Sequence, residues 1–216
     1  MEKQDLKILA QNLANPQGKK GIEIGEIMND TNIGMTLESI QTLLIEDDEH
    51  ILEIGHGNAD HVKSILNKAT NIKYTGIDIS ETMHNEAKRL NKHFEGQVDF
   101  VLYEGRKLPF QDKTFDKIFT VNTVYFWEQP VEYLNEIYRV LKDNGTFVLT
   151  FGQREFMEKL PFTQFDFKLY SNTEMEEIIS KSHFKRMKIS EREEQIKSKT
   201  SEETITRNYT ILTIKK

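Results

Sequence analysis

Hydrophobic positions along the chain follow two alternating patterns. Short apolar runs of strand length, bounded by glycine or polar residues, occupy five segments: 50–55, 72–79, 98–103, 115–122 and 146–152. Between several of these runs, apolar residues recur three or four positions apart, as on one face of a helix, over 59–68, 80–91 and 130–141. Strands that alternate with helices through short connections predict a parallel sheet with helices on both faces.

The N-terminal part precedes this alternation. Leucines at helical spacing predict a helix over 1–14, and Thr36 is expected to cap a second helix that runs to about Ile45. We therefore expect an N-terminal helical cap over 1–48 and a main domain over 49–216, both in one structural unit.

The C-terminal part departs from the pattern in a different way. After an expected helix over 173–182, the segments 187–196 and 208–216 both have the character of strands, with no helix between them. Consecutive strands joined by a loop pair antiparallel. The sheet should therefore be mostly parallel, with one antiparallel strand near an edge.

Composition narrows the range of functions. The chain has 216 residues and a net charge of −6, so one domain is expected and nucleic acid is a poor default partner. It has no cysteine, which excludes disulfides, thiolate metal sites and a cysteine nucleophile. Its start has no apolar signal segment, and no apolar run reaches the length needed to span a bilayer. We expect a cytoplasmic protein without membrane partners, and the sequence is silent on its oligomeric state.

The segment ILEIGHGNA is the first candidate for ligand binding. A buried strand is expected to end at Ile54, and Gly55 and Gly57 let the backbone turn sharply and pass close to a ligand. Ligands of open parallel sheets bind beyond the carboxyl ends of the strands. The next strand delivers Asp78 to that same edge, where its carboxylate can accept hydrogen bonds from both hydroxyls of a ribose.

Two acidic residues indicate which nucleoside is bound. A dinucleotide fingerprint requires a third glycine at position 60, but Asp60 stands there, and its charge would repel a pyrophosphate. Glu53 precedes the first glycine, and its carboxylate can orient a ligand ammonium directly or by fixing the loop. A ligand with an amino-acid end and no phosphate therefore fits better than NAD or FAD.

Several motifs in order resemble one known family. The pattern Glu53-x-Gly55-x-Gly57-x-Ala59 is similar to the first motif of class I S-adenosylmethionine-dependent methyltransferases, with alanine in place of the usual third glycine. YTGIDIS resembles the family's second strand, and two further segments resemble its later motifs: YEGRKLPFQDKTFDKIFTVN and YRVLKDNGTFVLT. The resemblance covers about half of the chain, and its small-molecule members of the ubiquinone/menaquinone-biosynthesis type are the most similar.

This resemblance implies a fold, a cofactor and a set of contacts. The fold is an α/β, Rossmann-like seven-stranded sheet that is mostly parallel, with its last strand antiparallel. The cofactor is S-adenosyl-L-methionine. The residues expected to bind it are Glu53, Gly55, Gly57, Asp78 at the ribose, Ile79 beside the adenine, Glu104 near the adenine amino group, Gly105 in the position where the family has alanine, and Asn122 near the methionine end.

The catalytic residues are unknown from the sequence. The sulfonium is already activated, so a strong base is not required, and the weak candidates for one are Tyr125, His56 and Glu128, in that order. His56 is not expected to bind metal, because no partner stands at ligand spacing. An aromatic run at 125–127 either packs under the following helix or lines the acceptor pocket. A second aromatic group, with Phe162, Phe165 and Phe167, either covers the site or packs on the surface.

The expected function is methyl transfer from S-adenosylmethionine to an unidentified small-molecule acceptor. Two alternatives stay open at this point. One is a nicotinamide-nucleotide-dependent oxidoreductase, against which Asp60 argues. The other is a non-catalytic module that binds S-adenosylmethionine without turnover.

Overall fold

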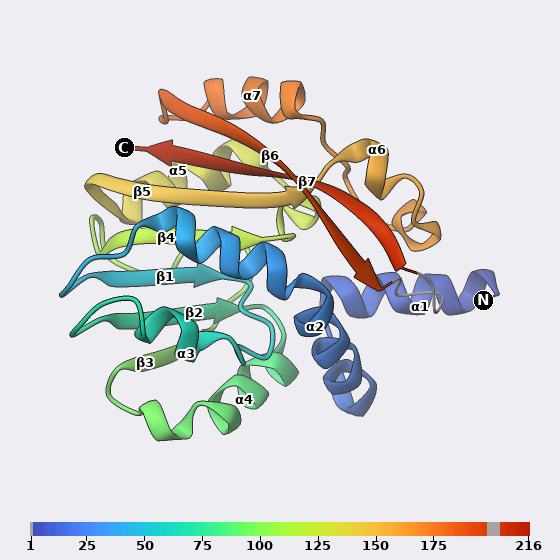
Figure 1. Ribbon diagram of the computed structural model, residues 1–216, viewed down its shortest axis with the longest axis horizontal. Helices are drawn as coiled ribbons and strands as arrows, with labels where there is room; N and C mark the ends of the chain where they lie inside the picture. Colours follow the sequence, from blue (N-terminus) through green and yellow to red (C-terminus); the bar gives the residue numbers. More distant parts are fainter. Residues whose placement is uncertain (1, 198–203) are drawn as a thin grey trace.

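A seven-stranded sheet forms the centre of the computed structural model, which describes residues 2–197 and 204–216 (Figure 1). The strands are β1 (His50–Ile54), β2 (Lys73–Asp78), β3 (Val98–Leu102), β4 (Phe115–Val121), β5 (Leu141–Gly152), β6 (Arg186–Lys197) and β7 (Thr204–Lys215). Their order across the sheet is β3-β2-β1-β4-β5-β7-β6. β1 to β5 pair in parallel, and β7 pairs antiparallel with both β5 and β6. The predicted fold class is confirmed.

Helices cover both faces of this sheet. They are α1 (Lys3–Ala14), α2 (Gly18–Leu43), α3 (Val62–Leu66), α4 (Glu81–Leu90), α5 (Pro130–Val140), α6 (Arg154–Met157) and α7 (Asn172–Ser180), with short 3-10 turns η1 (Lys92–Phe94), η2 (Val124–Phe126) and η3 (Pro161–Gln164). Phe147 and Leu149 of β5 pack in one core with α5 and α7. Val148, between them, packs in the other core with α2, α3 and α4. Successive strand residues thus serve opposite faces, as strand geometry requires.

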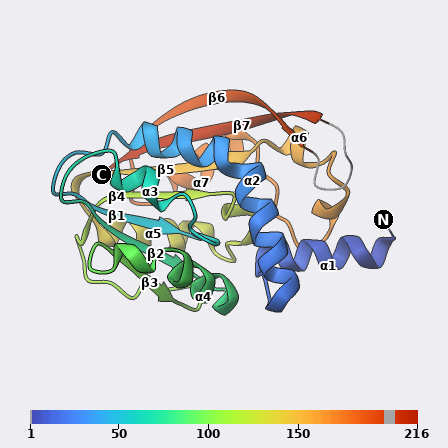
Figure 2. The ribbon, with the colours of Figure 1, turned by 60° about the horizontal axis from the view of Figure 1, so that its bottom comes forward.

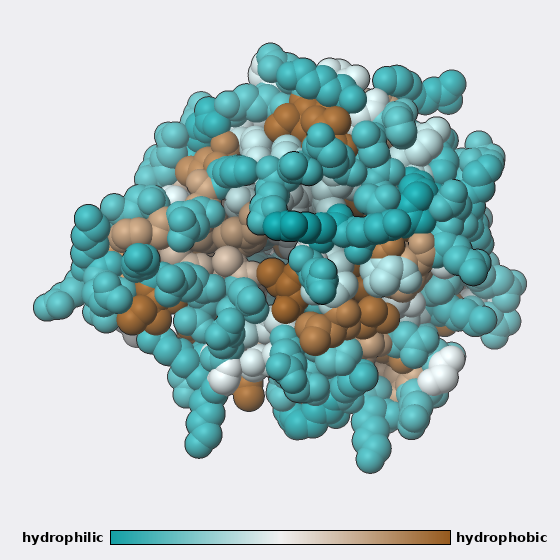
Figure 3. Space-filling view, turned by 180° about the vertical axis from the view of Figure 1, so that it is seen from behind, coloured by the Kyte–Doolittle hydropathy of each residue, from teal (hydrophilic) through white to brown (hydrophobic). Residues whose placement is uncertain are grey.

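The surface carries many charged side chains, in agreement with a sequence of which 30% is charged. Seen from behind, the face is mainly hydrophilic at its margins, and hydrophobic atoms are visible near its centre below a row of hydrophilic side chains (Figure 3). Within residues 2–197 and 204–216, no helix combines the length and the apolar character that a bilayer crossing requires.

α2 is longer than the sequence predicts. The prediction that a helix starts at Thr36 is wrong, because α2 runs unbroken from Gly18 to Leu43 and Thr36 is buried inside it. Two glycines near the start of α2 allow close packing. A Cβ at Gly21 would lie 2.7 Å from the carbonyl carbon of Pro16, and one at Gly25 would lie 2.7 Å from the sulfur of Met83. Glycine is therefore present where the helix passes close to its neighbours.

α1 and the first half of α2 lie beyond the carboxyl ends of the parallel strands (Figures 1 and 2). Two hydrogen bonds fix the connection between these helices to the start of α4. The hydroxyl of Ser80, which caps α4 as predicted, also donates to the carbonyl of Pro16, and the N–H of Gly18 donates to Thr82 Oγ1 (3.0 Å). The helical segment expected over 1–48 therefore reaches the edge of the sheet at which ligands bind; Met1 lies outside the described residues.

Two further elements differ from their predicted bounds. α3 begins at Val62 rather than at Ala59, because Ala59 has a φ of +54°, which no right-handed helix accommodates. β5 begins at Leu141 rather than at 146, and its pairing with β4 shifts register next to Phe115. This irregularity lies at the end of the sheet opposite the carboxyl edge of β4 and leaves that edge unchanged.

Candidate functional site

A cavity of about 150 Å³ lies where the loops after β1, β2 and β4 meet. Gly55 and Gly57 of the loop after β1 and Asp78 at the end of β2 line it, together with side chains from α1 and α2: Leu13, Met28, Asn32 and Thr36. The N-terminal helices therefore form one wall of the cavity, and the carboxyl edge of the sheet forms another.

The two glycines of the turn have different surroundings. Gly55 has a φ of +75° and Gly57 a φ of +57°, a region that side chains disfavour. A Cβ at Gly55 would collide with the methyl group of Thr123, whereas one at Gly57 would meet nothing within 4 Å. Gly55 is thus required for packing, and Gly57 leaves open space beside the backbone, where a ligand can approach closely.

Asp78 stands at the end of β2 and faces this turn. Its Oδ2 accepts a hydrogen bond from the N–H of Gly57 (3.0 Å), and its Oδ1 accepts one from the N–H of Ser80 (2.8 Å). Burial raises the pKa of Asp78 to about 6, although both hydrogen bonds act in the opposite direction. The carboxylate is therefore held in a fixed position by the backbone, and it remains ionised at neutral pH.

Glu53 belongs to a buried polar cluster that the sequence did not reveal. Its Oε2 accepts hydrogen bonds from His61 Nε2 (2.8 Å) and from the hydroxyl of Tyr74 (2.5 Å). Burial lowers the pKa of His61, but the charge and hydrogen bond of Glu53 outweigh that effect and leave the pKa above 6.5. Burial also raises the pKa of Tyr74, with Glu53 adding to the effect. Glu53 and His61 both line the cavity, and only their positions on either side of the glycine turn could have signalled their pairing.

Asn122 follows β4 in a strained conformation, with a φ of +58°. Its Oδ1 accepts a hydrogen bond from the N–H of Gly152 (3.3 Å) and lies 3.1 Å from the hydroxyl of Tyr125. Its Nδ2 lies 3.5 Å from the sulfur of Met35. These contacts fix the amide at the cavity wall, and Nδ2 can still donate a hydrogen bond to a ligand.

The remaining predicted contact residues divide into two groups. Ile79 and Gly105 line the cavity next to each other, and a Cβ at Gly105 would lie 3.2 Å from Ile79 Cγ2. Glu104 is exposed and lies outside the cavity lining, whereas its neighbours Tyr103 and Gly105 belong to it. The structure thus brings seven of the eight predicted residues together, all except Glu104.

Part of the chain is similar in sequence to known methyltransferases, and its fold is similar to theirs. The family described as a methyltransferase domain matches residues 52–149. YrhH of Bacillus subtilis, named as a proposed methyltransferase, is 33% identical over 51% of this chain and 62% of its own length. The demethylmenaquinone methyltransferase of Thermotoga maritima is 28% identical over 61% of this chain and 54% of its own length. The crystal structure of an S-adenosylmethionine-dependent methyltransferase from Aquifex aeolicus has a TM-score of 0.62 at 20% identity, and the match covers 95% of this chain and 96% of that one.

Residues 52–149 match a methyltransferase domain, and the relatives and solved structures together support a class I S-adenosylmethionine-dependent methyltransferase. S-adenosylmethionine is the cofactor of this family. The aligned region spans less than two thirds of YrhH and about half of the Thermotoga enzyme. The Aquifex structure, which matches almost end to end, shows that the two chains share the methyltransferase fold.

Within this methyltransferase fold, the three candidate bases have very different environments. His56 is buried and lines the cavity, and burial lowers its pKa to about 4. Its Nδ1 lies 2.7 Å from the carbonyl oxygen of Gly57, and its Nε2 has no hydrogen-bond partner among the described residues. Glu128 is exposed, pairs with Arg106 (3.2 Å), and lies outside the cavity lining.

Tyr125 is fully buried near the methyltransferase cavity but does not line it. Its hydroxyl accepts a hydrogen bond from the N–H of Gly152 (2.6 Å) and lies 3.1 Å from the carbonyl oxygen of that residue. Burial raises the pKa of Tyr125 well above its ordinary value. Its neighbours Phe126 and Trp127 do line the cavity, so the aromatic run both packs in the core and faces the site.

Proposed function

We propose that the chain transfers the methyl group of S-adenosylmethionine to a small-molecule acceptor bound at the same edge of the sheet. One observation carries this proposal. The buried carboxylate of Asp78 is bonded to the N–H of Gly57, at the position where the backbone leaves space that a Cβ would fill. A fixed acceptor beside an open backbone turn fits the sugar of an adenosyl ligand.

The cavity lining supports an orientation for this ligand. Asp78 would hold the ribose hydroxyls, and Ile79 and Gly105 would lie against the adenine. Glu53 would hold the ammonium group, because its Oε1 makes no hydrogen bond within the described part of the chain while Oε2 is held by His61. Asn122 would lie near the methionine end. The residues present therefore fit the cofactor without any metal or phosphate contact.

The N-terminal helices complete this arrangement. Side chains of α1 and α2 face the loops of the sheet across the cavity, as Leu13 and Met28 illustrate. This supports a division into a cap, up to residue 48, and a methyltransferase domain from residue 49. The cap would exclude water from the reacting atoms, which prevents wasteful hydrolysis and strengthens the polar contacts inside.

When bound, the cofactor would supply a methyl group that its sulfonium activates for transfer to a lone pair of the acceptor, and the sulfur would keep the bonding electrons. The protein's residues then have to align the acceptor with the S–CH₃ bond. Tyr125 is a poor base, because its hydroxyl is engaged by Gly152 and burial keeps it protonated. We infer that the acceptor brings its own nucleophilic lone pair, and that any proton it loses reaches solvent once the site opens after the transfer.

Ligand-dependent melting temperatures test this function. S-adenosylhomocysteine, NAD and NADP are added in turn to the whole chain, and a ligand that binds the folded state raises the melting temperature. We expect a rise with S-adenosylhomocysteine alone. A rise with NAD or NADP instead would favour the oxidoreductase alternative. If S-adenosylhomocysteine binds but no methyl transfer occurs over a broad panel of acceptors, the non-catalytic alternative is favoured.

A further inference from the structure

A second cavity, of about 60 Å³, adjoins the first. Five residues line both of them: Leu13, Met28, Asn32, Asn122 and Phe126. The second cavity lies on the Asn122 side of the site, where the methionine end of the cofactor is proposed to lie. A molecule in the second cavity would therefore meet the methyl group across Asn122 and Phe126.

Aromatic and aliphatic side chains form most of the lining of this second cavity. The ring of Phe167 lies 4.7 Å from that of Phe126, 5.7 Å from that of Tyr125 and 5.8 Å from that of Phe162, measured between centroids. The other apolar residues come from both ends of the chain and from the segment after β5: Leu13, Met28, Phe156, Met157, Leu160, Ile196 and Ile205. Such a lining favours an apolar ligand.

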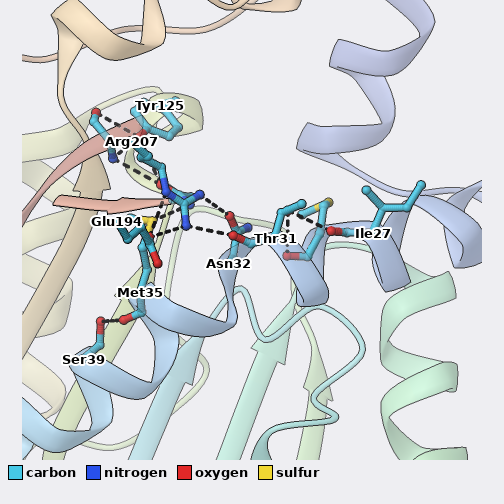
Figure 4. Close-up of polar contacts among 11 residues, drawn as sticks. Ile27, Thr31, Asn32, Met35, Ser39, Tyr125, Glu194 and Arg207 are labelled. Carbon is cyan, nitrogen blue, oxygen red and sulfur yellow. Dashed lines mark hydrogen bonds and ion pairs between the residues drawn. The ribbon is translucent and has the colours of Figure 1, made fainter. Parts of the chain in front are cut away.

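Arg207 is the only charged residue among the described residues that line the second cavity, and its charge is already compensated (Figure 4). It is 4% exposed. Its Nε and Nη2 donate to Glu194 Oε1 (3.0 and 2.6 Å), Nη2 also donates to the carbonyl of Thr31 (2.8 Å), and Nη1 donates to Asn32 Oδ1 (2.9 Å). A ligand carboxylate would have to displace Glu194 to gain this cation, so the arrangement does not select an anion.

The amide side chain of Asn122 is a polar group that lines both cavities. Its oxygen is occupied by Gly152 and Tyr125, but Nδ2 has only the weak contact with Met35. An oxygen atom of an acceptor could accept a hydrogen bond from Nδ2 and be held next to the cofactor cavity.

We propose that the second cavity is the acceptor site and that it takes an uncharged, largely apolar molecule whose single polar end meets the amide of Asn122. This inference rests on the proposed function, because it uses the position of the cofactor. It adds the chemical class of the acceptor: a neutral ring or short hydrocarbon with one polar end. Molecules with a carboxylate or an ammonium group at the apolar end are excluded.

Three phenols of similar size test this inference through their binding to the wild-type chain saturated with S-adenosylhomocysteine. They are 4-propylphenol, 4-hydroxyphenylacetate and tyramine, which carry a neutral, an anionic and a cationic tail on the same phenol. We expect 4-propylphenol to bind at least tenfold more tightly than either charged probe. Equal or tighter binding of a charged probe would overturn the inference.

A matched pair of variants locates the binding. Leu160→Trp places an indole in the second cavity, whereas Leu169→Trp makes the same change in the same segment outside either cavity. We expect Leu160→Trp to weaken binding of 4-propylphenol at least tenfold and Leu169→Trp to leave it unchanged. If Leu160→Trp does not fold, Phe167→Ala removes one wall and should weaken binding at least fivefold. Unchanged binding in the folded cavity variant would overturn the inference.

The affinity for S-adenosylhomocysteine, measured in each protein, distinguishes a failure of the acceptor inference from a failure of the proposed function. If S-adenosylhomocysteine binds to the wild type and no phenol does, the acceptor inference fails while the proposed function stands. If S-adenosylhomocysteine does not bind, both fail.

Discussion

The carboxylate of Asp78 accepts a hydrogen bond of 3.0 Å from the backbone N–H of Gly57. This bond joins the end of β2 to the turn after β1, so the position of the acid and the shape of the glycine turn depend on each other. Four predictions follow from this pair and from the polar cluster beside it.

The first prediction concerns the side chain of Asp78. Asp78→Ala should weaken binding of S-adenosylhomocysteine by about 1–3 kcal/mol, roughly 5- to 150-fold, because it removes charged hydrogen bonds to the ribose. Isothermal titration calorimetry measures the change. Asp60→Ala serves as the control, since Asp60 is exposed and lies outside the cavity lining. An affinity equal in the Asp78 variant and the wild type contradicts the assignment.

The second prediction concerns pH. The pKa of Asp78 in the free protein is raised to about 6 by burial, and hydrogen bonds from a ribose favour the charged form. Binding therefore releases a proton below pH 6. Affinity for S-adenosylhomocysteine should be level above that pH and fall by up to about tenfold per unit below it.

Asp78→Asn provides the control for this pH profile. It keeps the size of the side chain and removes its titration, so the fall below pH 6 should disappear. Glu53, His56 and His61 also line the cavity, and they remain in the variant. If the fall persists in Asp78→Asn, one of these groups causes it instead.

The third prediction compares two glycines with the same backbone. Gly57 and Gly18 have φ values of +57° and +59°, and a Cβ would meet nothing within 4 Å at either position. Alanine at either site should destabilise the fold by about 1 kcal/mol through the left-handed conformation alone. Only Gly57→Ala places its methyl group in the cavity, and it should weaken binding of S-adenosylhomocysteine more than tenfold.

Urea unfolding and calorimetry together decide this comparison. Gly18 lies outside the cavity lining, so Gly18→Ala should keep the affinity of the wild type. Equal losses of affinity in the two variants would show that strain, rather than contact with the ligand, controls binding.

The fourth prediction concerns the ion pair between His61 and Glu53. The pKa of folded His61 is raised, so the pair stabilises the protein fully below pH 6.5 and loses this effect as pH rises through the folded value. His61→Gln should lower the free energy of unfolding by about 3 kcal/mol at pH 6, because it leaves a buried carboxylate without its cation. The deficit should shrink at pH 9.

Urea unfolding at both pH values measures this deficit, and His93→Gln is the matched control at an exposed histidine. A deficit of the same size at pH 6 and pH 9 would indicate that packing rather than charge makes His61 important. Loss of stability in His93→Gln would indicate that the assay responds to any histidine change.

The sequence predicted the sheet because its signals are local. The apolar run of β1, the glycines after it and the Ser80 cap of α4 each act through neighbouring residues, and the structure confirms all three. Seven of the eight residues expected to bind the cofactor line one cavity, with Asp78 and Gly57 in direct contact, and their role in binding stays a prediction. Glu104 is the exception. Its position in the motif says nothing of its orientation, and the structure leaves it exposed.

Contacts between distant segments could not be predicted. Tyr74 reaches Glu53 from the neighbouring strand, and Arg207 reaches Thr31 from the other end of the chain. Neither pair has a spacing that marks it in one sequence. The sequence did not predict the unbroken α2 for a related reason. Its glycines are needed because Pro16 and Met83 pack closely against them, and these contacts join segments that are not marked as neighbours in the sequence.

The continuity of α2 also bears on how molecules enter the site. Its second half is anchored to the sheet, where Ser39 Oγ lies 2.7 Å from Thr150 Oγ1, and its first half supplies Met28 and Asn32 to both cavities. Because no turn interrupts α2, its first half cannot leave the carboxyl edge of the sheet without bending the helix. We therefore expect the connection between α1 and α2 around Pro16, which the hydroxyl of Ser80 holds by a hydrogen bond, to be the point at which this wall opens for ligands.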